Sequence, residues 1–243
     1  MQPASVSVFR TSFFALLESY APTLLGGPEA RAPHKAAQTL AAGQVGIFGV
    51  LGGPSDWFAD SDYSAIRASV RRALADPSVR TIDLIVDSPG GSVLGLPETA
   101  DVIFQANKVK PVNARIVGIA ASAAYWLAAQ ASTITLTPSG EVGSVGVLDL
   151  HADISGALEK EGVKLTAIVA GPHKIERAPF APLSDDAQAH MQTGVNAWYS
   201  DFLGAIRRGR GARVSHAGNY GGGRMLSARE ALSTGLVDFV LPL

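Results

Sequence analysis

The chain has 243 residues, with 20 lysines and arginines against 21 aspartates and glutamates, so its net charge is −1. This balance provides no global field for nucleic acid or a membrane surface, and we expect no nucleic-acid partner. The absence of cysteine excludes disulfides, thiolate metal sites and cysteine nucleophiles. No run reaches the roughly 20 apolar residues that span a bilayer, and the first residues lack a secretory signal pattern. We therefore expect an unprocessed protein without a membrane span.

The N-terminal residues differ in pattern from the rest of the chain. Apolar residues at helical spacing within 8–20 predict an amphipathic helix. The Pro-, Gly- and Ala-rich stretch 21–38 predicts a linker or an extended arm, which could pack on its own body or dock on a neighbouring subunit. We favour docking. Residues 1–42 are thus expected to form a helix and an arm, and residues 43–243 a single compact domain.

From residue 43 onward, strand patterns alternate with helix patterns. The nearly continuous apolar run 81–86 is of the kind buried in a parallel sheet, and strand, helix and strand at this spacing indicate right-handed crossovers. We expect an α/β domain with a mostly parallel sheet. Strands are also predicted at 133–136, 143–148 and 164–169. A long helix over 184–210 ends in three arginines that we expect to be solvated, Arg207, Arg208 and Arg210.

Ser122 stands between a strand pattern at 114–118 and a helix pattern. A hydroxyl at such a point lies near unpaired backbone N–H groups and the positive end of the helix dipole, which can stabilise a developing oxyanion. Its neighbours Ala121, Ala123 and Ala124 are small enough for a substrate backbone to approach. Ser122 is therefore our candidate nucleophile. The alternative is that this serine only caps the helix, as many serines do.

Two glycines, Gly90 and Gly91, follow the apolar run 81–86. Paired glycines at the carboxyl end of a strand can expose backbone N–H groups to a ligand, although they also serve ordinary strand-to-helix turns. Neither a Rossmann nor a P-loop fingerprint is present at this turn. The five histidines are scattered without metal-binding spacing, so we expect no metal. A Ser-His-Asp triad stays open, because its members need not be close in the chain.

Five motifs occur in a fixed order, and together they are more specific than any one of them. They are DSPGGSV at 87–93, AASAAYWLA at 120–128, GSVGV at 143–147, AGPHK at 170–174 and ALSTGLVD at 231–238. The set resembles the S49 peptidase family, which includes signal peptide peptidase A and the head-maturation proteases of tailed phages. Since no membrane anchor is evident, the chain is more similar to the phage or prophage branch.

The resemblance assigns roles to five residues. It implies that Ser122 is the nucleophile, that Lys174 is the general base and that the Ser144 hydroxyl orients the lysine. Gly91 and Ala123 match the positions whose backbone N–H groups would form the oxyanion hole. This chemistry is consistent, because a serine needs an adjacent base. A lysine acts as a base only when its amine is neutral, which requires burial or a cationic neighbour.

The resemblance also implies a fold, an activity and partners. The fold would be a ClpP/crotonase-like α/β spiral of repeated β-β-α and βαβ units, with residues 43–243 as the S49 catalytic domain. The activity would be that of a serine endopeptidase without a cofactor. Its polypeptide substrates would be phage capsid or scaffold proteins or signal-peptide-like chains, in the bacterial cytoplasm or the phage prohead. A homo-oligomeric ring or dome is expected.

We further expect each catalytic site to be complete within one chain and to be gated by assembly, because Ser122 and Lys174 both belong to the chain. Two other functions remain open. A crotonase-type acyl-CoA enzyme would polarise a thioester with the same glycines, but it needs a carboxylate and a nucleotide site that no motif marks. A non-catalytic assembly component would carry a degenerate site, which the combined presence of Ser122, Ser144 and Lys174 disfavours.

Overall fold

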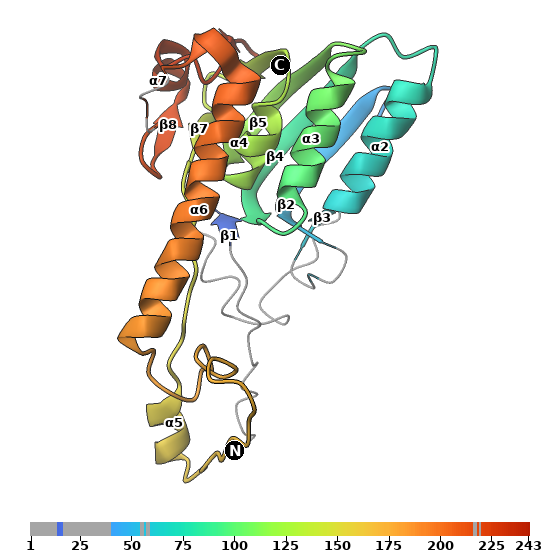
Figure 1. The fold of residues 1–243 in the computed structure, drawn as a ribbon. Helices are drawn as coiled ribbons and strands as arrows, with labels where there is room; N and C mark the ends of the chain where they lie inside the picture. Colours follow the sequence, from blue (N-terminus) through green and yellow to red (C-terminus); the bar gives the residue numbers. More distant parts are fainter. Residues whose placement is uncertain (1–13, 17–39, 54–55, 57–58, 216–217, 219) are drawn as a thin grey trace.

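A computed structural model describes residues 14–16, 40–53, 56, 59–215, 218 and 220–243. Its sheet has the strand order β3-β2-β4-β5-β6-β9, with β1 paired to β4, β7 paired to β5, and β8 paired to β7. All of these pairs are parallel except β1 with β4 and β7 with β8. The predicted α/β class with a mostly parallel sheet is therefore confirmed (Figure 1).

The strands are β1 (Phe14–Leu16), β2 (Gln44–Gly52), β3 (Ser61–Asp62), β4 (Ile82–Ser92), β5 (Val112–Ala121), β6 (Thr133–Leu136), β7 (Glu141–Gly143), β8 (Met225–Ser227) and β9 (Phe239–Val240). The helices are α2 (Tyr63–Ala75), α3 (Leu96–Ala106), α4 (Ala123–Ala128), α5 (Ser155–Lys160), α6 (Asp185–Arg210), α7 (Ala228–Ser233) and the 3₁₀ helix η3 (Gly211–Arg213).

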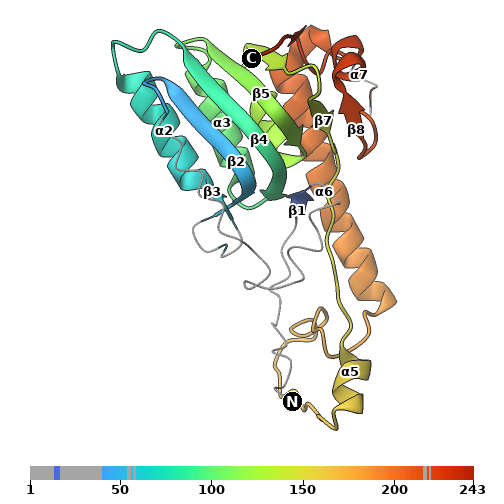
Figure 2. The same ribbon diagram turned by 180° about the vertical axis from the view of Figure 1, so that it is seen from behind.

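Helices α2, α3, α4 and α6 lie on one face of the sheet, as the two opposite views show (Figures 1 and 2). Along the central strands β4 and β5, residues that face the helices are buried and alternate with more exposed ones. Leu84 and Ile116 are completely buried, whereas Val117 is 43% exposed. In the single chain, the apolar run 81–86 is therefore covered on one face only. Its composition predicts a strand that is buried on both faces, and this prediction is wrong for the single chain.

Two central strands run further than the sequence predicts. The apolar run 81–86 continues as β4 through Gly90 and Gly91 to Ser92, because the backbone of β2 pairs with it as far as Leu51 and Gly91, with a shift in register between Phe48 and Val50. Strand β5 likewise extends to Ala121, immediately before the candidate nucleophile. Both strands thus deliver their motif residues to the same end of the sheet, since they are parallel neighbours.

Other predictions fail where pairing across the fold decides the structure. Residues 14–16 lie in the predicted helix 8–20 but form β1, because they pair with the backbone of β4. The remaining residues of that helix and of the arm 21–38 lie outside the described residues. The predicted strand 164–169 is not a strand, and only residue 143 of the predicted strand 143–148 belongs to one, β7. Within the described residues, neither segment forms a further strand, and only an isolated bridge is present at Leu148.

An extension containing residues 149–184 leaves the body of the protein. It holds α5, and it lies at the far end of α6 from the sheet in both views (Figures 1 and 2). Helix α6 begins where the extension ends, with the Ser184 hydroxyl accepting a hydrogen bond from the Ala187 amide at 3.2 Å. This extension carries the motif that ends in Lys174.

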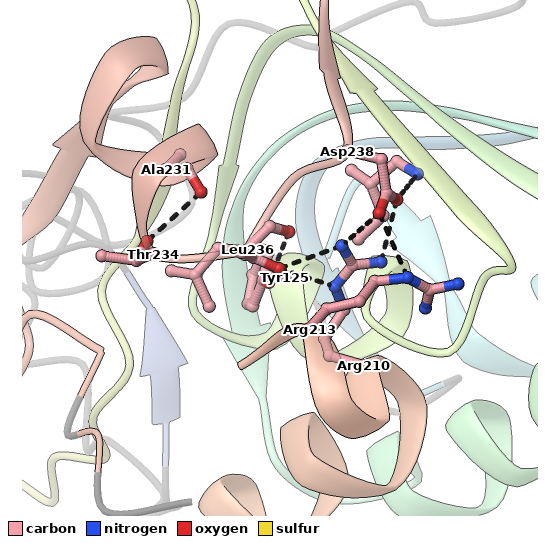
Figure 3. A network of polar contacts seen from close by, with 9 residues as sticks. Tyr125, Arg210, Arg213, Ala231, Thr234, Leu236 and Asp238 are labelled. Carbon is pink, nitrogen blue, oxygen red and sulfur yellow. Dashed lines mark hydrogen bonds and ion pairs between the residues drawn. The ribbon is translucent and has the colours of Figure 1, made fainter. Parts of the chain in front are cut away.

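The last turn of α6 is locked to the C-terminal segment by a buried ion pair (Figure 3). Arg210 is 1% exposed, and its guanidinium donates two hydrogen bonds to the Asp238 carboxylate at 2.8 and 3.0 Å and two to the Gly235 carbonyl. Asp238 also accepts from the Ile134 amide at 2.7 Å. The expectation that Arg210 is solvated is therefore wrong, because a carboxylate distant in the chain and a backbone carbonyl both pair with it.

Replacing Arg210 with methionine should lower the free energy of unfolding at pH 7 by about 3–5 kcal/mol, because the Asp238 carboxylate would lose its buried partner. Burial works to raise the pKa of Asp238, but hydrogen bonds from Arg210 and the Ile134 amide outweigh it and hold the pKa below its ordinary value. Since the folded-state pKa is lowered, this stabilisation is present above the ordinary carboxyl pKa and is lost as the pH falls through the lowered value.

Urea unfolding at pH 7 and pH 3 would measure both effects, and the difference between wild type and Arg210→Met should shrink below about pH 4. Arg213→Met is the matched control. It removes a 45% exposed side chain that pairs with the same carboxylate at 3.3 Å, and should cost under about 1 kcal/mol. Equal losses in the two variants would contradict the assignment of the buried pair as the stabilising one.

Candidate active site

Ser122 occupies a strained turn between β5 and α4. Its backbone angles are φ 53° and ψ −119°, and φ is in the left-handed region that non-glycine residues rarely adopt. Although Ser122 is the N-cap residue of α4, its side chain makes no capping hydrogen bond. The capping interpretation therefore does not account for the hydroxyl. Strain of this kind persists only where the surrounding structure enforces it, and it is concentrated at functional sites.

Backbone contacts on both sides hold Ser122 in this conformation. Its amide donates to the Gly143 carbonyl at 2.8 Å, and its carbonyl accepts from the Trp126 amide at 3.0 Å, which starts α4. The Ser122 hydroxyl donates to the Gly146 carbonyl at 3.3 Å, and the residue is fully buried. The hydrogen bond from Ser122 to Gly146 could not be predicted from the sequence, because the two residues lie in separate loops that the folded sheet brings together.

Ser144 lies beside this turn. It stands between Gly143 and Gly146, the two residues whose carbonyls accept hydrogen bonds from Ser122. Its own amide donates to the Arg224 carbonyl at 2.9 Å, and its φ of 50° makes it a second strained serine. The structure therefore brings the two motif serines to one point at the end of β5 and β7.

Gly91 and Ala123 are the predicted oxyanion donors. Gly91 lies in β4 against the backbone of β2, where any Cβ atom would collide with the carbonyl of Leu51. This close approach explains why glycine is required there. Ala123 is the fully buried first residue of α4, and N–H groups in the first turn of a helix have no partner within that helix. Both residues belong to the end of the sheet that holds Ser122.

Lys174 is not brought to Ser122 within the single chain. It lies in a turn of the extension, where its amide donates to the Gly171 carbonyl at 3.2 Å and its side chain is exposed. The extension lies at the far end of α6 from the sheet (Figures 1 and 2). The segment that carries the lysine does not fold back onto the sheet in the single chain, and the expectation of a site that is self-contained once the protein assembles stays a prediction.

The extension is also apolar and exposed around the lysine. The large hydrophobic side chains that it leaves in solvent in the single chain are Leu150, Val163, Leu165, Ile168, Val169 and Ile175. Among them, Ile168 is 96% exposed. A segment of β-branched residues without a strand partner is a template for pairing with another chain.

An ion pair that the sequence did not reveal links two segments of the extension. Arg177 donates to Asp149 at 2.5 Å, and the Asp149 side chain is 1% exposed. Burial raises the pKa of the Asp149 carboxyl, and the nearby Arg177 guanidinium offsets this only in part. The pair joins the chain where it leaves the body to the chain that returns from the lysine turn. No local pattern predicts it, because the two residues lie far apart in the sequence.

One group of possible metal ligands comes together within the described residues. Side-chain atoms of His173, Glu176 and Asp186 lie within 4.8 Å of one another, and His173 Nδ1 lies 2.9 Å from the Glu176 carboxylate. The sequence spacing gave no hint of this group, since Asp186 belongs to α6. Exposed acidic groups of this kind are common without a metal.

Comparison with known proteins identifies the chain's relatives. The model of Peptidase family S49 matches residues 105–241, which include Ser122, Ser144 and Lys174. The chain belongs to this family. The α/β architecture with a mostly parallel sheet is consistent with the ClpP-like fold of S49 peptidases.

Two of the proteins to which the chain is similar come from phages, and a third comes from a bacterium. The chain is 34% identical over 181 residues to the Capsid assembly protease C of Escherichia phage lambda, covering 72% of this chain and 40% of that protein. It is 35% identical over 147 residues to the Head-tail preconnector protein GP5 of Enterobacteria phage P21, covering 60% and 29%. It is also 28% identical over 172 residues to Protease 4 of Salmonella typhi, covering 70% and 28%. This S49 chain therefore spans less than half the length of each of these three relatives.

The comparisons agree with the resemblance seen in the sequence motifs, both in the family and in the phage branch. Among the helices in the described part of this S49 chain, none is both long enough and apolar enough to cross a membrane.

Proposed function

We propose that the protein is a serine endopeptidase in which Ser122 is the nucleophile, with residues 43–243 as its catalytic domain. The observation that carries the proposal is the strained, fully buried Ser122 at the β5–α4 turn, whose hydroxyl does not cap the helix. Membership of the S49 family supports a peptidase over the acyl-CoA alternative. Two further motif residues, Ser144 and Gly91, lie at the same end of the sheet.

The proposed reaction passes through an acyl-enzyme. The Ser122 oxygen attacks the peptide carbonyl carbon while its proton passes to the neutral amine of Lys174. The negative charge on the carbonyl oxygen is stabilised by the backbone N–H groups of Gly91 and Ala123. The lysine then protonates the leaving amine as the peptide bond breaks. Water, deprotonated by the same lysine, hydrolyses the ester and restores the Ser122 hydroxyl. Ser144 is proposed to orient the lysine amine.

We propose that Lys174 reaches Ser122 from a neighbouring copy of the chain. Two observations support this. The lysine turn lies at the far end of α6 from the sheet, and the extension around it exposes large apolar side chains that an assembly would bury. Burial in such an interface favours the neutral form of an amine, which is the form a general base requires. A ring or dome of identical subunits would repeat this contact at every interface.

The proposed substrates are polypeptides of a phage capsid or scaffold, processed in the bacterial cytoplasm or within the prohead. The similarity to a capsid assembly protease and to a head-tail preconnector protein supports this setting. Signal-peptide-like chains are the second substrate class, supported by the weaker similarity, at 27% identity over 203 residues, to the Putative signal peptide peptidase SppA of Enterococcus faecium. In both cases the cleaved group is an amide in an extended polypeptide, and no cofactor takes part in the proposed reaction.

A fluorophosphonate probe tests the proposal directly, since it forms a covalent bond only with an activated serine oxygen. Incubation of the assembled protein with the probe, followed by digestion and mass spectrometry, should place the label on Ser122. The Lys174→Ala variant should be labelled far more slowly, because it lacks the base. Labelling of another serine, or labelling of Ser122 at the same rate in both proteins, would contradict the proposed roles. A non-catalytic assembly component should give no label at Ser122.

A further inference from the structure

The described part of the N-terminal segment is a strand on the end of β4. Strand β1 runs antiparallel to β4, with Phe14 opposite Ser92, Ala15 opposite Gly91 and Leu16 opposite Gly90. The other edge of β4 is already paired there with β2, at Val50 and Leu51. Strand β1 therefore takes the second edge of this part of β4. Both views show it beside the end of β4 (Figures 1 and 2).

This edge is the one that β5 leaves just before the nucleophile. The pairing of β4 with β5 ends at Ser88 and Ala120, and β5 itself ends at Ala121, one residue before Ser122. Beyond that point the edge of β4 is open to another strand, and β1 fills it. Ala15 thereby lies opposite Gly91, the residue proposed as an oxyanion donor.

An open strand edge beside a nucleophile can bind an extended polypeptide. A peptide that adds a strand to a sheet edge is held by main-chain hydrogen bonds, which depend little on its sequence. Gly90 and Gly91 have no side chains that would obstruct such a strand. An endopeptidase must hold its substrate in an extended form against the nucleophile, so substrate and β1 would use the same backbone groups.

Ser122 is inaccessible to a substrate in this structure. Ser122 is fully buried, and its hydroxyl proton is directed at the Gly146 carbonyl, which accepts a hydrogen bond but does not act as a base. A scissile peptide bond has no access to the oxygen in this arrangement. Binding of substrate therefore requires some part of the covering structure to move, and β1 lies on the strand edge that substrate would need.

We propose that the edge of Gly90–Ser92 is the binding site for the extended substrate backbone, and that residues 14–16 occupy it as an internal competitor. This inference rests on the proposed peptidase function. A strand of three residues forms only a few hydrogen bonds, and each contributes little net free energy. A substrate can therefore displace this strand. The N-terminal segment thus lowers cleavage without abolishing it, and any partner that draws this segment away raises it.

Two variants of the full chain test the proposal. In the first, residues 14–16 become Pro-Pro-Pro (Phe14→Pro, Ala15→Pro, Leu16→Pro), which removes all three backbone N–H groups. In the matched control they become Ala-Ala-Ala (Phe14→Ala, Leu16→Ala), which keeps those groups. The proline variant should cleave an unfolded protein about tenfold faster than wild type, whereas the alanine variant should stay within about twofold of it. A synthetic peptide of residues 10–20 should restore competitive inhibition of the proline variant.

Amide hydrogen exchange separates this inference from the proposed function. In a Ser122→Ala background, where catalysis plays no part, the amides of Gly90–Ser92 should exchange faster in the proline variant than in the alanine control. Loss of that protection supports the occupancy of this edge by β1 even if no variant proves to be a peptidase. Unchanged exchange together with unchanged cleavage would overturn the inference and leave the Ser122 mechanism intact. Slower cleavage by the proline variant would overturn it too, because β1 would then be a structural part of the site.

Discussion

Cleavage of an unfolded protein is expected to fall by roughly 10⁴-fold or more when Ser122 is replaced by alanine, because the reaction loses its nucleophile. The fold should survive the change. Alanine keeps the Cβ atom, so the strain at φ 53° is the same, and only the 3.3 Å hydrogen bond to Gly146 is lost, at a cost of about 1 kcal/mol. The measurements are the initial rate of cleavage of a labelled unfolded protein and the thermal unfolding midpoint.

The matched control for this change is Ser139→Ala, which alters an exposed serine in the turn before β7. It should keep the wild-type rate and the wild-type unfolding midpoint. If Ser122→Ala retained more than about one per cent of the wild-type rate while remaining folded, another residue would be the nucleophile. A large fall in its unfolding midpoint would instead assign Ser122 a structural role.

The architecture could be predicted because its signals are local. The apolar run 81–86, the proline that follows α2 and the cap at Ser184 each depend on neighbouring residues, and the structure has an element at each place. Predictions failed where distant residues decide. Periodicity favours a helix around residues 14–16, yet the open backbone of Gly90–Ser92 makes them a strand. A charged residue at a helix end is expected to be exposed to solvent, yet Arg210 is buried and donates hydrogen bonds to the carboxylate of Asp238 in the C-terminal segment.

The candidate site was predictable in part for the same reason. Ser122, Ser144 and Gly91 follow or end neighbouring strands, so a parallel sheet brings them to one edge. The Gly146 carbonyl that accepts from Ser122 could not be identified, because loop positions depend on the whole fold. The position of Lys174 could not be predicted either. An apolar segment packs on its own chain or on a neighbouring chain according to which surface is within its reach. The sequence pattern of the segment is the same in both cases and does not distinguish them.

Mixing two inactive variants should therefore restore activity. Ser122→Ala lacks the nucleophile but keeps the lysine, and Lys174→Ala has the opposite defect. If each site takes its serine from one chain and its lysine from the next, randomly mixed assemblies contain intact pairs at about a quarter of their sites. Unfolding and refolding the two variants together at equal concentration should thus give about 25% of the wild-type rate. Each variant refolded alone should give almost none.

The matched control is a mixture of Ser122→Ala with the double variant Ser122→Ala/Lys174→Ala, which has no intact serine in any chain. It should remain inactive at every ratio, and this shows that refolding itself creates no activity. Restored activity should also vary with the mixing ratio and be greatest at equal amounts, since the number of complete pairs is the product of the two fractions. A mixture as inactive as its components would mean that each serine depends on the lysine of its own chain. The extension would then have to fold back onto the sheet, and the exposed row around Ile168 would need another explanation.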